Sequence, residues 1–73
     1  MNDDLNTIIS KFLKIPKSEI NEQTIIDSSA VKGSVLFHRM ISRINDLFDI
    51  EINNYSQIKT YKNLIDEIDL HKK

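Results

Sequence analysis

Apolar side chains recur with the period of an α-helix in three separate stretches of this chain. Within residues 5–13 the apolar positions fall at i, i+3, i+4, i+7 and i+8, which places them along one face of a helix. A similar spacing returns over residues 34–48 and over residues 61–68. The chain has one Gly and one Pro, whereas a turn-rich all-β fold needs special backbone angles often. The sequence therefore predicts a small all-α bundle with three main helices.

Polar residues mark the expected ends of these helices. Asp3 and Asp4 open the first helix, where a carboxylate stabilises free amide groups and opposes the positive end of the helix dipole. Pro16 follows the first helix and ends it, because the residue before a proline is disfavoured in helical geometry. Ser34 is the expected N-cap of the second helix, and Thr60 is the expected N-cap of the last one.

The segments between the helices are expected to be irregular but ordered. Residues 17–33 show no sustained period, and a loop of this length in a small domain is usually functional. Residues 48–52 alternate like a strand, but a lone strand has no partner, so we expect an extended connector that buries Ile50 and Ile52. Residues 53–58 have room for one short helical turn. The apolar residues expected to hold the long loop against the helices are Ile20, Ile25, Ile26 and Val31.

Size and composition exclude several classes of function. Residues 1–73 form one expected domain, with a core over about residues 3–69, and a chain this short has no room for the deep cleft of a multi-substrate enzyme. The chain has no Cys, which excludes disulfides, thiolate metal sites and a thiol nucleophile of its own. Ten basic and eleven acidic residues give a formal charge of -1, so we expect no nucleic-acid partner. No apolar run reaches the roughly 18 residues of a membrane span, so we expect no membrane insertion and a cytoplasmic location. We also expect a monomer.

The residues of most chemical interest lie where the long loop becomes the second helix. There the sequence is Lys32-Gly33-Ser34-Val35. The N-terminus of a helix offers unpaired amide groups and a positive dipole end, which together favour a phosphate. Gly33 has no side chain and would let the active site of another protein approach the Ser34 hydroxyl. Taken alone, a Gly-Ser pair is more often a simple helix start than a site of modification.

The chain as a whole resembles the acyl carrier proteins, which hold growing acyl chains on a phosphopantetheine arm. The resemblance covers about residues 5–68. The residues that carry it are Ser34 at the head of the second helix, Phe48-Asp49-Ile50-Glu51-Ile52 at the family's usual distance from that serine, Ile8-Ile9 through Leu13 with Ile15 and Ile20 after them, and Ile58-Lys59-Thr60-Tyr61 at the start of the last helix.

This resemblance implies a four-helix bundle, in which a short third helix joins the three main ones. It implies that 4'-phosphopantetheine from coenzyme A is attached to Ser34 by a separate phosphopantetheinyl transferase, with Gly33 and Val35 beside the arm. The thiol that carries the acyl group would belong to the arm, in agreement with a chain without Cys. Such a carrier is not an enzyme, and its other partners would be acyl-loading and acyl-transfer enzymes. The residues expected to dock them are Val35, His38, Arg39, Ser42 and Arg43.

The chain departs from the family in several places. Gly33 stands where an acidic residue usually precedes the serine, and Val35 replaces a Leu. The second helix is basic where the family is acidic, through His38, Arg39 and Arg43. Charges at the rim of an interface set the choice of partner more than affinity. We therefore expect a specialised carrier in fatty-acid, lipid or secondary-metabolite synthesis, with a reduced third helix.

A second interpretation is an unmodified helical interaction module. Arg39 and Arg43 lie four residues apart and could form a basic strip for nucleic acid. Two arginines on a near-neutral domain are more often a solvated face, and Asp46, three residues after Arg43, is expected to offset its charge. His38 and His71 are far apart and lack carboxylate companions, so no metal site is expected. A carrier-like domain that is never loaded is a third possibility.

Overall fold

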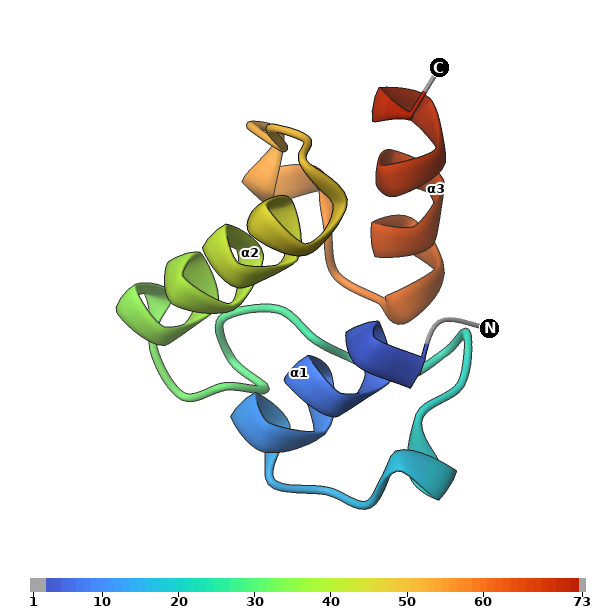
Figure 1. Ribbon diagram of the computed structural model, residues 1–73. Helices are drawn as coiled ribbons and strands as arrows, with labels where there is room; N and C mark the ends of the chain where they lie inside the picture. Colours follow the sequence, from blue (N-terminus) through green and yellow to red (C-terminus); the bar gives the residue numbers. More distant parts are fainter. Residues whose placement is uncertain (1–2, 73) are drawn as a thin grey trace.

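The computed structural model describes residues 3–72 and contains three α-helices (Figure 1). The helices are α1 (Asp3–Leu13), α2 (Ser34–Phe48) and α3 (Tyr61–His71). Two 3-10 turns lie in the connecting segments, η1 (Lys17–Glu19) and η2 (Tyr55–Gln57). No strand occurs within the described residues. The predicted all-α class is confirmed.

A single core lies where the three helices meet. α2 runs back past α1, and α3 stands at a steep angle to both in the view of Figure 1. Each helix turns its apolar face inward, as its sequence period predicts. The buried helical residues are Leu5 and Ile9 of α1, Phe37, Met40, Ile41 and Ile44 of α2, and Tyr61, Leu64 and Ile68 of α3.

The long loop between α1 and α2 is held against the core by its own apolar side chains. Ile26 and Val31 are buried, and Ile20 packs against the core from a half-buried position. Ile25 was expected to join them, but it is 49% exposed. The backbone here is extended, so successive side chains point to opposite sides, and burying Ile26 turns Ile25 outward.

The loop is also tied to the start of α3 by backbone hydrogen bonds. Ile25 and Thr60 form an isolated antiparallel bridge, and the amide of Ile26 donates to the carbonyl of Lys59 at 2.9 Å. The Thr60 side chain caps α3 as predicted, and it forms a reciprocal capping box with Asn63. These contacts fix the loop that leads into α2.

The connector after α2 pairs with no strand in the described structure and buries Ile52 completely, as predicted. Ile50 is half-buried against the same core. The side-chain oxygen of Asn45 accepts a hydrogen bond of 3.0 Å from the amide of Ile52, which fixes the connector to the last turns of α2. The expected short turn in residues 53–58 is the 3-10 turn η2. At the place of the short third helix that the family resemblance implies, the chain therefore has three residues of 3-10 turn.

Candidate functional site

The N-terminus of α2 is capped by Gly33 rather than by Ser34. The carbonyl of Gly33 accepts the first hydrogen bond of the helix, from the amide of Phe37 at 3.0 Å. Ser34 is the first helical residue, and no side chain caps α2. The prediction that Ser34 is the N-cap is therefore wrong by one residue. The reason is the backbone of Gly33, whose φ of 145° is open to glycine and strained for other residues, so the turn into the helix is made one position earlier.

The backbone around Gly33 is well anchored, and the space beside it is open. Its amide donates a hydrogen bond of 2.8 Å to the carbonyl of Ser28, and the preceding residue, Lys32, has a left-handed φ of 63°. A Cβ built on Gly33 would find no atom within 4 Å. Apart from its two chain neighbours, no described residue therefore crowds the position of a side chain on Gly33.

Asp27 organises the loop that leads to this junction. Its Oδ1 accepts hydrogen bonds from the Ser29 hydroxyl at 2.6 Å, the Ser29 amide at 3.1 Å and the Ala30 amide at 3.2 Å. The hydrogen bond from the Ser29 hydroxyl is the largest cause of a lowered pKa of Asp27, and the two amides and the charge of Lys59 act in the same direction. Burial opposes the shift but does not reverse it. Asp-Ser-Ser is a typical turn signal, from which this turn could have been predicted.

The hydroxyl of Ser34 is exposed and makes no hydrogen bond within residues 3–72. Val35 beside it is 67% exposed. The amides of the first turn of α2 lack a side-chain acceptor, so they and the helix dipole favour an anionic group here. The junction therefore has an accessible hydroxyl oxygen beside the N-terminus of α2, which favours the binding of a phosphate.

Of the five residues predicted to dock partners, the structure brings three together in one groove. Arg39, Ser42 and Arg43 line a groove between α1 and α2. His38 lies outside that groove and stacks on the ring of Tyr55 in η2, with centroids 4.5 Å apart. Val35 is exposed but does not line the groove. Only three of the five predicted residues thus share one site.

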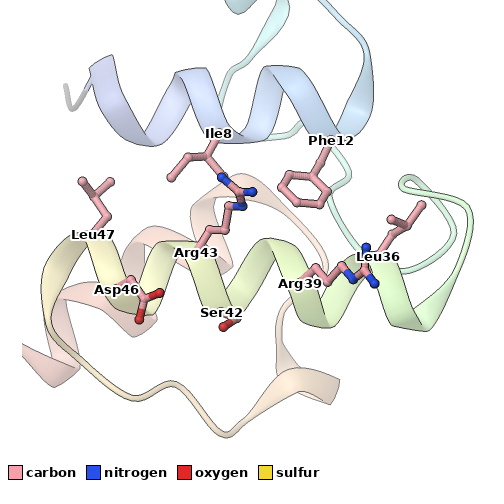
Figure 2. A pocket seen from close by; sticks show the side chains of 8 residues that line it. All are labelled: Ile8, Phe12, Leu36, Arg39, Ser42, Arg43, Asp46 and Leu47. Atoms are coloured by element: carbon pink, nitrogen blue, oxygen red, sulfur yellow. The ribbon is translucent and has the colours of Figure 1, made fainter.

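The groove between α1 and α2 has a volume of about 760 Å³ and is open to solvent (Figure 2). Ile8 and Phe12 project into it from α1, and Arg43 extends from α2 toward them. Asp46 was expected to offset Arg43, but these two side chains form no salt bridge in the described structure, and Asp46 turns away from α1. The apolar period of α1 places Ile8 and Phe12 in the core stripe, where they do pack, and does not show that they also line a groove.

Two further properties concern the described residues, 3–72. They contain no group of three or more His, Cys, Asp or Glu side chains placed to hold a metal ion. None of their helices combines the length and the apolar character needed to cross a bilayer.

Comparison with known proteins assigns no family to the chain. It matches no protein-family model, no curated protein and no solved structure.

Proposed function

We propose that this chain is an acyl carrier protein whose 4'-phosphopantetheine arm is attached to Oγ of Ser34. The observation that supports this most is the position of that hydroxyl: exposed, without a hydrogen-bond partner in the described structure, on the first residue of α2. A serine that only capped the helix would use its oxygen on a backbone amide, and Ser34 does not. The sequence motifs at residues 8–20, 48–52 and 58–61 support the same function.

The attachment is a phosphoryl-transfer reaction in which this chain supplies the nucleophile. Ser34 Oγ attacks the phosphorus next to the pantetheine of coenzyme A, and the bond from that phosphorus to the leaving adenosine bisphosphate breaks. A base of the phosphopantetheinyl transferase takes the hydroxyl proton. The free amides of the first turn of α2 stabilise the negative charge of the phosphodiester that forms. Once attached, the arm supplies the thiol that this Cys-free chain lacks.

The backbone at Gly33 accounts for one departure from the family. The carrier family usually has an acidic residue before the serine, and an L-residue at φ 145° would be strained. Glycine is therefore the residue that adopts this backbone conformation without strain. Without the neighbouring carboxylate, loading depends on a transferase that recognises the Ser34 junction by other contacts, which fits a specialised carrier with dedicated partners.

The helices support a reduced version of the carrier bundle. α1, α2 and α3 supply the three main helices, and the 3-10 turn η2 takes the place of the short one. In this function the chain is a cytoplasmic, non-catalytic carrier that presents thioesters to acyl-loading and acyl-transfer enzymes of fatty-acid, lipid or secondary-metabolite synthesis.

Enzymatic loading in vitro tests this function. The chain is incubated with coenzyme A and a broad-specificity phosphopantetheinyl transferase, and its intact mass is measured. We expect a gain of one phosphopantetheinyl group on the wild type and none on Ser34→Ala. Ser18→Ala is the matched control, because Ser18 is an exposed serine outside α2 and outside the groove, and it should load like the wild type. Equal loading of Ser34→Ala, or no loading of the wild type by transferases of different specificity, would contradict the proposal.

A further inference from the structure

The groove between α1 and α2 has an apolar floor that is open to solvent. Leu36 and Leu47 of α2 are 40% and 37% exposed, and Ile8 and Phe12 of α1 face them from half-buried positions. In Figure 2 these side chains lie along the space between the two helices. Apolar side chains gathered in one open groove mark an interaction site more often than scattered ones do.

Basic side chains surround this floor and are not neutralised. The groove and its extension along α1 are lined by Lys11, Lys14, Arg39 and Arg43. None of these four forms a salt bridge within the described residues. The chain as a whole carries a formal charge of -1, so this positive charge is concentrated at the groove and does not reflect a basic protein. Asp46 is the one acidic residue among those that line it.

We propose that this groove binds an acidic amphipathic helix of a partner protein. The apolar side chains of such a helix would cover Leu36, Leu47 and Phe12, and carboxylates beside them would face Arg39 and Arg43. An apolar stripe flanked by acidic residues matches both parts of the groove, and helices commonly bind in apolar grooves of this kind. A nucleic-acid backbone would pair with the cations but would leave the apolar floor unused.

This site is separate from the Ser34 hydroxyl, although the two are neighbours. Leu36 and Arg39 lie in the first two turns of α2, whose first residue is Ser34. A partner helix in the groove would therefore hold its protein next to the attachment site. The binding itself needs no prosthetic arm, so it can be tested on the unmodified chain.

The test uses two synthetic peptides on the unmodified full chain. The first is an amphipathic helix with a leucine stripe flanked by glutamates, and the second has glutamines in place of the glutamates. Fluorescence anisotropy measures binding, and amide chemical shifts locate it. We expect the glutamate peptide to bind about tenfold or more tightly than the glutamine peptide. The shifts should be centred on Ile8, Phe12, Leu36 and Arg43.

Variants distinguish the contribution of the basic side chains to binding from that of the apolar side chains. Arg39→Gln/Arg43→Gln should weaken binding of the glutamate peptide about tenfold, and Leu36→Asn should weaken it to a similar degree. Lys59→Gln/Lys62→Gln makes the same change in net charge outside the groove and should bind like the wild type. Ser34→Ala should also bind like the wild type, which keeps this test independent of loading.

Three outcomes would overturn the proposal. One is equal binding of the two peptides, and another is a Lys59→Gln/Lys62→Gln effect as large as that of the arginine pair. The third is preferential binding of duplex DNA or of anionic phospholipid vesicles that is lost in Arg39→Gln/Arg43→Gln but kept in Leu36→Asn. That pattern would assign the basic residues to phosphate contacts instead.

Discussion

The phenol of Tyr61, in the first turn of α3, donates a hydrogen bond of 2.6 Å to the side-chain oxygen of Asn6 in α1. The two residues are far apart in sequence, and the bond links the first helix to the last. Tyr61 is buried, and burial raises the pKa of its hydroxyl. Losing this hydroxyl should therefore weaken the packing of α3 on α1.

We expect Tyr61→Phe to lower the free energy of unfolding by about 1 kcal/mol, because it removes one buried hydrogen bond and leaves the ring in place. Because the pKa is raised on folding, the wild type should lose stability as the pH rises above the unfolded value of 10.0. Tyr61→Phe should lose less over the same range. Urea unfolding at neutral and alkaline pH measures both effects, and a parallel loss in the two proteins would contradict this account.

Gly33 should be hard to replace because of its backbone conformation. We expect Gly33→Ala to lower the free energy of unfolding by about 1–3 kcal/mol, because alanine is strained at a φ of 145°. Crowding does not contribute, because an added Cβ meets no atom within 4 Å. Lys32→Ala, in the same loop, is the control and should change stability by only about 0.5 kcal/mol. Equal stability of Gly33→Ala and the wild type would show that the loop has another conformation.

Ser34 should matter little for stability. Its hydroxyl caps no amide, so we expect Ser34→Ala to change the free energy of unfolding by only about 0.5 kcal/mol. Ile44→Ala is the comparison, and it should cost about 2–5 kcal/mol because Ile44 is fully buried. Thermal or urea unfolding measures both. A loss of 1 kcal/mol or more (about the value of a helix cap) in Ser34→Ala would restore Ser34 as the N-cap.

Asp27 should make the loop sensitive to acid. Its pKa is lowered from 3.8 in the folded chain, mainly by the Ser29 hydroxyl, so its ionised form stabilises the fold. This contribution is present above the unfolded pKa and is lost as the pH falls through the folded value. Ser29→Ala should raise the pKa of Asp27 toward 3.8 and reduce stability at neutral pH more than in acid. An NMR titration of the Asp27 carboxyl checks the shift, and an unchanged pKa in Ser29→Ala would exclude the hydroxyl as its cause.

The helices could be predicted because their apolar period is strong and local. Pro16 and Thr60 fall close to the observed ends of α1 and the start of α3. The N-cap of α2 was predicted one residue late, because a Gly-Ser pair does not by itself show that Gly33 has a positive φ. Ile25 was assigned inward for a similar reason, since the register of an extended segment depends on what it pairs with.

The Ser34 junction could be located from the sequence, but the groove could not. Ile8 and Phe12 belong to the apolar stripe of α1, and the period alone does not show how much of that stripe α2 covers. The spacing of Arg43 and Asp46 fits an ion pair, but in the structure Arg43 extends toward α1 and Asp46 turns away. The direction that each of these side chains takes depends on how α1 and α2 pack, which is a property of the folded chain.

The most direct test of the central claim is the intact mass of this protein purified from the cells that make it, with the modified peptide identified by fragmentation. We predict a population that carries one phosphopantetheinyl group, free or acylated, on Ser34. A protein whose Ser34 is unmodified under every growth condition would contradict the carrier function.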